Sequence, residues 1–156
     1  MARDPIPTWF FVLVVVRLGR RYLLVRERKH GQLWYLPAGR VEPGETFVQA
    51  AQRETLEEAS IPIVIEGVLR VEHSPQPDGT ARVRVIFIAH PADDTPPKIH
   101  ADQESLGAGW FTLDELETLP LRGDEVREIF RYVNQSPSIY PVGLITYEGA
   151  AFAQRL

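Results

Sequence analysis

Residues 39–61 read GRVEPGETFVQAAQRETLEEASI, and this stretch decides how the rest of the chain is interpreted. Its centre holds three glutamates, Glu54, Glu57 and Glu58. If the stretch is helical, positions i, i+3 and i+4 lie within about 100° of one another around the helix axis. The three carboxylates therefore share one face of the predicted helix.

The same face is apolar closer to the start of the helix, where Phe47, Ala50 and Ala51 fall on the side of the glutamates. An apolar face normally packs against the core, so the carboxylates are expected at the rim of the interior. Like charges four residues apart destabilise an isolated helix by about 0.2–0.5 kcal/mol, and partial burial raises that cost. A bound divalent cation would remove the conflict. The alternative is an ordinary solvated acidic face.

The predicted helix has a defined start. Thr46 and Gln49 have the spacing of a capping box, so the helix is expected to begin at Thr46. Pro43 and Gly44 suit a tight turn just before it. The preceding residues 36–45, LPAGRVEPGE, are expected to form a loop with irregular backbone close to the helix.

The stretch resembles the signature of the nudix hydrolases. In order, the matching residues are Gly39, Glu45, Arg53, Glu54, Glu57 and Glu58. Five residues separate Gly39 from Glu45, and seven separate Glu45 from Arg53. Ser60 stands where the family has a glycine that ends the helix, so a left-handed backbone is expected there. Serine adopts that conformation at a cost of about 1 kcal/mol.

The resemblance implies a metal site. Glu54, Glu57 and Glu58 would bind Mg²⁺, with Mn²⁺ as the alternative, because Mg²⁺ prefers oxygen ligands and commonly joins carboxylates to substrate phosphates. In this family the backbone carbonyl before the signature, here that of Ala38, often joins the ligands. Gly39 would lie next to the ligands without binding the metal itself.

The resemblance also assigns roles in the reaction, which is attack of a water on a phosphoanhydride. One of Glu57, Glu58 and Glu104 would take the proton. Arg53 would orient the glutamates or contact phosphate, and Glu45 would support Arg53 or the metal-bound waters. Glu104 is preferred to Asp102 as the additional acidic residue that nudix enzymes often place before a Trp-Phe strand. The alternative for Glu104 is an exposed acidic loop.

Five further side chains are candidates for contact with substrate. Arg26 and Arg28 would reach toward a phosphate from one face of a strand, unless they are solvated arginines at its end. Trp34 and Tyr35 could line a pocket for a base, unless they are core aromatics. Arg84, on one face of a later strand, completes the set.

The pattern of the chain predicts a mixed sheet between helices, an α/β (α+β) fold. Strands are expected at Thr8–Leu18, Tyr22–Arg28, Leu33–Leu36, Ile63–Val71, Thr80–His90 and Ala108–Phe111, and helices at Thr46–Ala59, Leu113–Glu117 and Gly123–Asn134. Residues 91–105 are expected to form a long loop of the kind that carries functional groups. The resemblance supplies the architecture, a nudix-type three-layer α/β/α sandwich.

The 156 residues are expected to form a single domain (1–156), with a core at 8–134. The tail, 135–156, has no clear pattern: it wraps the domain, contacts a partner subunit or is partly disordered. The apolar run Trp9–Val16 is interpreted as a buried strand because it is short for a membrane span and lacks a cleavage site.

Composition narrows the function further. A net charge of −4 argues against binding of nucleic acid polymers or membrane surfaces. No cysteine is present, which excludes disulfides and thiolate metal sites and is compatible with a cytoplasmic location. A small-molecule nucleotide is the expected partner, and the protein would be a monomer or a homodimer.

Three hypotheses for the function remain. Outside the signature, WYLPAGRVEPGE, DQESLGAGWF and PLRGDEV are similar to nudix phosphatases that act on oxidised guanine nucleoside diphosphates. In that case Trp34, Tyr35 and the loop at 121–123 would read the base. An alternative is a pyrophosphatase for a nucleoside-diphosphate sugar or another nucleoside-diphosphate derivative. A hypothesis of another class is a non-catalytic module that senses a nucleotide.

Overall fold

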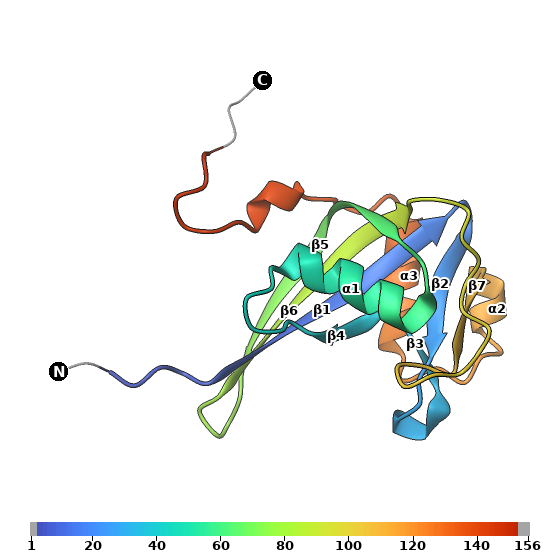
Figure 1. The fold of residues 1–156 in the computed structure, drawn as a ribbon, viewed down its shortest axis with the longest axis horizontal. Coiled ribbons are helices and arrows are strands. Elements are labelled where there is room, and N and C mark those ends of the chain that lie inside the picture. Colours follow the sequence, from blue (N-terminus) through green and yellow to red (C-terminus); the bar gives the residue numbers. More distant parts are fainter. Residues whose placement is uncertain (1–2, 153–156) are drawn as a thin grey trace.

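The computed structural model describes residues 3–152, which fold around one seven-stranded sheet (Figure 1). The strands are β1 Thr8–Leu18, β2 Arg21–Arg26, β3 Trp34–Tyr35, β4 Ala38–Arg40, β5 Ile63–Pro75, β6 Ala81–Pro91 and β7 Gly107–Phe111. The helices are α1 Phe47–Ala59, α2 Leu113–Leu116 and α3 Glu125–Asn134, with short 3₁₀ turns at His30–Gln32 and Val142–Leu144. Within residues 3–152, no helix combines the length and the hydropathy needed to cross a membrane.

Strand β1 is the centre of the sheet. It pairs in parallel with β6 on one side, and on the other it pairs antiparallel with both β4 and β2. β4 pairs with the first half of β1 and β2 with its last two residues. Strand β5 extends the sheet beyond β6, while β3 and β7 both pair with β2. The sheet is therefore mixed, as predicted.

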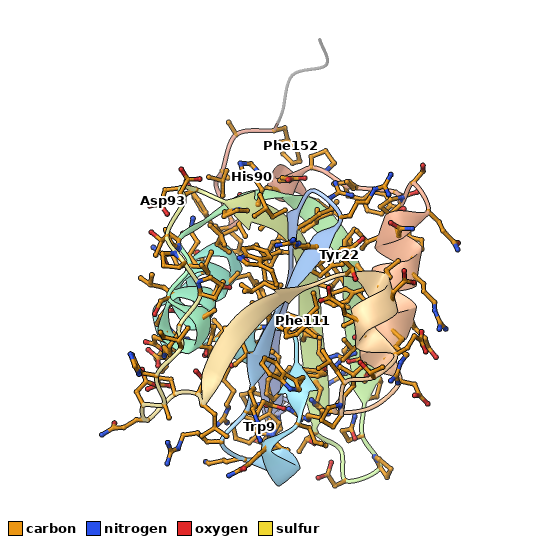
Figure 2. The ribbon with its side chains drawn as sticks, turned by 90° about the vertical axis from the view of Figure 1, so that its right-hand side faces the viewer. Trp9, Tyr22, His90, Asp93, Phe111 and Phe152 are labelled. Carbon is orange, nitrogen blue, oxygen red and sulfur yellow. The ribbon has the colours of Figure 1, made fainter. Side chains whose placement is uncertain are left out.

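The side chains of β1 alternate between two hydrophobic cores, as the two-residue period of a strand requires. Val12 and Val14 pack with the buried alanines of α1, whereas Leu13 and Val15 pack with Phe130 of α3. Tyr22 lies on the α3 side of the sheet (Figure 2). Its ring stacks on that of Phe130, with centroids 4.4 Å apart. The sheet thus lies between α1 and the α2–α3 pair, which confirms the three-layer α/β/α sandwich (Figure 1).

Several predicted boundaries differ from the structure, mostly by one or two residues, and three differences affect the site or the sheet. The loop expected at residues 36–45 is not irregular throughout, because Ala38–Arg40 pairs with β1 as β4. The strand expected to reach Arg28 ends at Arg26. Strand β5 continues to Pro75, since its ladder with β6 continues to the pair Pro75 and Ala81.

The tail returns to the sheet after α3. The N–H groups of Tyr140 and Val68 each donate to the carbonyl oxygen of the other residue, both at 2.8 Å. Gly67 permits this contact, because a Cβ there would lie 2.6 Å from the carbonyl oxygen of Tyr140. Farther along, Ile145 packs on the α1 side of the core. The tail therefore contacts the domain as far as Ile145, whereas Tyr147 and Phe152 farther along are 74% and 99% exposed. The role of the tail stays a prediction.

Candidate active site

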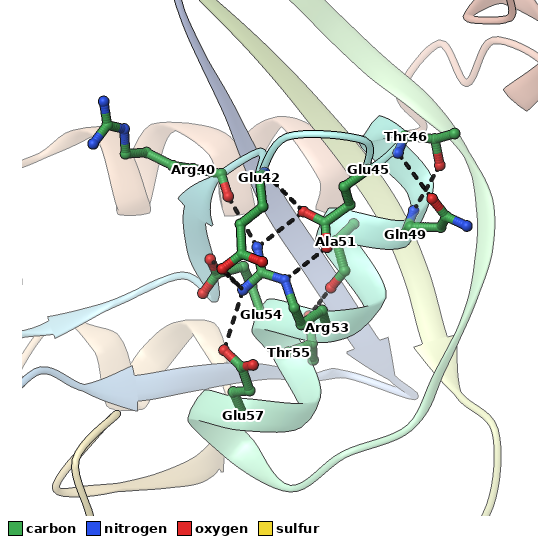
Figure 3. Close-up of polar contacts among 10 residues, drawn as sticks. All are labelled: Arg40, Glu42, Glu45, Thr46, Gln49, Ala51, Arg53, Glu54, Thr55 and Glu57. Carbon is green, nitrogen blue, oxygen red and sulfur yellow. Dashed lines mark hydrogen bonds and ion pairs between the residues drawn. The ribbon is translucent and has the colours of Figure 1, made fainter.

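Helix α1 has the predicted start and end. Thr46 Oγ1 accepts a hydrogen bond from the Gln49 N–H at 3.1 Å, and the Gln49 side chain accepts one from the Thr46 N–H at 2.9 Å (Figure 3). The helix ends at Ser60, whose φ of 62° is left-handed. Serine therefore occupies the conformation for which the signature has glycine, as expected.

The three glutamates of α1 differ in exposure. Glu58 is 9% exposed, and the side chain of Glu54 is 14% exposed. Glu57, which directly precedes Glu58, completes this carboxylate cluster, and its side chain is 41% exposed. The predicted inward direction therefore holds for Glu54 and Glu58, while Glu57 lies at the rim.

Strand β4 forms the wall that these carboxylates face. The Ala38 N–H donates to Glu58 Oε1 at 3.1 Å. A Cβ at Gly39 would overlap the carboxyl group of Glu54, lying 2.6 Å from Oε2 and nearer still to Oε1 and Cδ. Gly39 is thus required for the close approach of Glu54 to the strand, which gives a physical reason for a glycine at the start of the signature.

Arg53 joins the carboxylates on the outer side of the cluster (Figure 3). Its guanidinium donates to Glu45 at 2.7 and 3.0 Å, to Glu54 at 2.9 Å and to Glu57 at 3.2 Å. It also donates to the Arg40 carbonyl oxygen in β4 at 2.9 Å. The hydrogen bonds from Arg53 lower the pKa of the Glu45 carboxyl. Arg53 therefore connects α1 to both the preceding loop and β4.

The inner side of the cluster has an excess of negative charge. Burial raises the pKa of Glu58 well above its usual value, and the nearby charges of Glu54 and Glu27 raise it further. Burial also raises the pKa of Glu54, with smaller contributions from the charges of Glu57 and Glu104. In residues 3–152 no basic side chain forms an ion pair with Glu58. A cation at this position would favour the charged carboxylates.

The donor set suits a hard divalent cation, because it consists of carboxylate oxygens beside a strand backbone. As the side chains stand in residues 3–152, however, no three acidic or histidine side chains are grouped closely enough to hold a metal ion. Arg53 holds Glu54 and Glu57 by hydrogen bonds, whereas Glu58 accepts from the Ala38 N–H. The contact of Ala38 with the cluster is through its N–H, and ligation by its carbonyl stays a prediction.

The aromatic candidates lie on the α3 side of the sheet. Tyr35 is buried, and its hydroxyl donates to Glu125 Oε1 at 2.6 Å. The ring of Trp34 packs edge-on against Phe111, with centroids 5.0 Å apart. Arg122 lies 4.7 Å above the Tyr35 ring. The structure thus brings together Trp34, Tyr35 and the loop that carries Arg122, and the Tyr35 ring is part of the core. A base pocket at this place stays a prediction.

The arginine candidates all have protein partners. Arg84 pairs with Glu72 at 2.6 Å and with Glu125 at 2.7 Å. Arg26 Nε donates to the Gln32 carbonyl oxygen at 3.4 Å, and Arg28 donates to that of Asp102 at 2.7 Å. Because Arg28 lies beyond the end of β2, the strand alternation that placed it beside Arg26 was wrong.

Several residues near the cluster were not identified from the sequence. They are Glu27, Lys98 and Ser105. Glu125, on the α3 side of the sheet, was also not identified. Glu27 accepts from Arg122 at 3.0 Å, and Lys98 and Ser105 contact the end of α1. Partners so far apart in the sequence leave no local pattern, so only the fold reveals them.

Comparison with known proteins agrees with this geometry. The NUDIX domain family matches residues 9–133. The human 8-oxo-dGDP phosphatase NUDT18 is 38% identical over 130 residues, 80% of this chain and 39% of the relative. The NAD-capped RNA hydrolase NudC of Yersinia pestis is 36% identical over 120 residues, 76% of this chain and 44% of the relative. A NUDIX hydrolase structure from Nitrosomonas europaea superposes with a TM-score of 0.75 at 28% identity, covering 92% of this chain and 99% of that one. The chain thus spans about two fifths of the length of these curated relatives.

Proposed function

Because this chain belongs to the NUDIX domain family, we propose that it is a Mg²⁺-dependent hydrolase that cleaves a phosphoanhydride bond in oxidised guanine nucleoside di- or triphosphates. The observation that carries the proposal is the partly buried carboxylate cluster of α1, which faces β4 and in which Glu58 forms no ion pair with a basic side chain of residues 3–152. The similarity to 8-oxo-dGDP phosphatases over 80% of the chain supports the substrate class.

In this proposal Glu54, Glu57 and Glu58, with the carbonyl of Ala38, would hold Mg²⁺ or Mn²⁺. Such an ion would supply positive charge for the phosphates and would make a water easier to deprotonate. Glu57, Glu58 or Glu104 accepts the proton of the attacking water. The charge of Glu104 acts on Glu54, which supports a position facing the cluster.

Arg53 fixes the helix against Glu45 and β4, and Gly39 leaves the space that the Glu54 carboxylate fills. Together they orient the metal-binding face of α1. We further propose that Arg26, Arg28 and Arg84 supply positive charge around the bound nucleotide, since anionic substrates are drawn to clefts lined by cations.

The base would be read on the α3 side, by Trp34 and Tyr35 with residues 121–123. Backbone hydrogen bonds hold this loop against β3: the Trp34 N–H donates to the Pro120 carbonyl oxygen, and the Arg122 N–H donates to that of Trp34, both at 2.9 Å. A base could stack on the half-buried Trp34, whereas the buried Tyr35 would form the floor of the pocket.

A second candidate function is hydrolysis of a nucleoside diphosphate that carries another group, such as a sugar or a second nucleoside. One observation favours it. The lining of a groove of about 1070 Å³ includes Glu54 together with Trp9, Phe10, Phe47 and Tyr147. This groove could hold the group on the far side of the cleaved bond.

The test is a substrate panel with Mg²⁺ that follows release of phosphate, pyrophosphate or nucleoside monophosphate. It contains oxidised and normal guanine di- and triphosphates, nucleotide sugars and NAD. Preference for oxidised guanine nucleotides supports the first function, and preference for sugars or NAD supports the second. Binding of a nucleotide without any product would indicate the sensing module.

Glu57→Gln and Glu58→Gln test the site itself. Each should lower turnover at least about 100-fold, as the loss of a charged group at the reacting centre does, while the metal-free melting temperature stays near that of the wild type. Glu148→Gln, on the exposed tail, is the matched control and should retain full turnover. Wild-type turnover in both site variants would refute the assignment.

A further inference from the structure

The C-terminal end of α1 is held by a loop distant in sequence, residues 92–106. The last four carbonyl groups of a helix normally lack partners within the helix. Here Leu56 O accepts from the Ser60 N–H, and Ala59 O accepts from the Lys98 N–H, both at 2.9 Å. Glu57 O accepts from the Lys98 ammonium, and Glu58 O accepts from Ser105 Oγ at 2.6 Å. Thus three of these four carbonyls are bonded by Lys98 and Ser105.

Both side chains are removed from solvent. Ser105 is fully buried, and the side chain of Lys98 is 9% exposed. A buried ammonium is costly unless it is paired and hydrogen-bonded. Lys98 meets this condition with the Glu57 carbonyl and with Asp102 Oδ2 at 2.6 Å. A positive charge at the C-terminal end of a helix also interacts favourably with the helix dipole.

The same ion pair shapes the loop that carries Glu104. Asp102 Oδ1 accepts from the N–H groups of Glu104 and Ser105 at 2.9 and 3.1 Å, which closes a tight turn. Asp102 Oδ2 is bonded to Lys98. The ammonium of Lys98 therefore joins the backbone of Glu57 to the turn that presents Glu104.

We infer that Lys98 and Ser105 are positioning residues that fix the backbone of Glu57 and Glu58 relative to Glu104. Their effect on catalysis rests on the proposed function, because it acts through those three carboxylates. A shift of about 1 Å in a reacting group can cost about 100-fold in rate. The hydrogen bonds of Lys98 and Ser105 hold the end of α1 and the loop of Glu104 together, so they oppose such a shift.

Lys98→Met tests the inference, since it keeps most of the stem and removes the ammonium. Amide hydrogen exchange in the metal-free protein should quicken at least about tenfold in the last turn of α1, with little change at Ala50 in its first turn. Mn²⁺ binding should weaken about tenfold and kcat should fall about tenfold or more, with a small change in KM. Lys98→Arg should restore part of kcat, and Ser105→Ala should reproduce the local exchange effect.

Lys29→Met is the matched control, because Lys29 is the other lysine of the chain and lies exposed in the β2–β3 loop. It should leave exchange, Mn²⁺ binding and kcat unchanged. Unchanged exchange at the end of α1 in Lys98→Met would overturn the inference. So would a uniform rise in exchange along the whole helix, which would indicate general destabilisation. If the wild type hydrolyses no nucleotide, the proposed function fails, while the exchange experiment still decides the role of Lys98.

Discussion

Gly39→Ala introduces one methyl group at the contact between β4 and α1. The methyl carbon would lie 2.6 Å from Glu54 Oε2 and would overlap the rest of the carboxyl group. Because atoms in contact normally keep about 3.5–4.0 Å between carbons, the carboxylate must retreat by about 1 Å or more. Gly39 does not have a positive φ, so the backbone itself accepts alanine. The whole effect therefore comes from displacement of Glu54.

The expected loss of stability is small, whereas the expected loss of turnover is large. Overpacking costs about 1–3 kcal/mol, and reduced freedom of the unfolded chain returns about 0.4–1 kcal/mol. The net loss of about 1–2 kcal/mol would lower Tm by about 2–8 °C for a domain of this size. Displacing a metal-binding carboxylate by about 1 Å should lower kcat about 100-fold. The variant should thus remain folded and lose most of its turnover.

The assay combines thermal melts with turnover at saturating Mg²⁺. Gly143→Ala is the control, because a Cβ there meets no atom within 4 Å and its φ is not positive either. Adding Glu54→Asp to Gly39→Ala shortens the side chain and should recover Tm without recovering kcat. Wild-type Tm and kcat in Gly39→Ala would refute the role assigned to this glycine.

Two further predictions concern the C-terminal end of α1 and the ion pair between Arg84 and Glu125. Ser60→Gly relieves about 1 kcal/mol of left-handed strain but gives the unfolded chain freedom worth about 0.4–1 kcal/mol, so Tm should rise by at most about 2 °C. The kcat should not change, and a Tm several degrees lower in the melt would contradict this. For Arg84→Met, the relevant group is Glu125, whose pKa lies below its usual value mainly because Arg84 donates to it. A carboxyl with a lowered folded-state pKa stabilises the protein above about pH 4.3 and loses that contribution as the pH falls through the lowered value. Arg84→Met should therefore lower Tm near pH 7, and its difference from the wild type should shrink near pH 3; equal differences at both pH values would count against the pairing.

Helix α1 was predictable because the sequence features that specify it lie within the helix and its two caps. The capping box, the apolar spacing and the left-handed end at Ser60 all lie within 15 residues of sequence, and each is present in the structure. Strand β4 was missed because its conformation depends on β1. Residues Ala38–Arg40 contain Gly and lie among turn formers, and only the ladder with Phe11–Leu13 makes them a strand.

The site was predictable in composition and less so in orientation. Spacing alone indicated that Glu54 and Glu58 face inward, and both do. The same reasoning suggested that Tyr35 and Arg84 contact a ligand. In the structure Glu125, 90 residues after Tyr35, accepts from the hydroxyl of Tyr35 and from Arg84. A polar or aromatic side chain on a strand face has the same pattern whether its partner is a substrate or a distant glutamate.

The two sides of the carboxylate cluster of α1 differ in how much positive charge lies beside them. On the outer side, Arg53 bonds Glu45, Glu54 and Glu57, so one positive charge is shared among three carboxylates. On the inner side, Glu58 is buried and accepts one backbone hydrogen bond, from Ala38. A cation that enters between Glu54 and Glu58 would therefore gain most from Glu58 and would compete with Arg53 for the other two. In the proposed metal site, this competition would make the affinity for the ion depend on how firmly Glu45 holds Arg53, although Glu45 need not touch the metal.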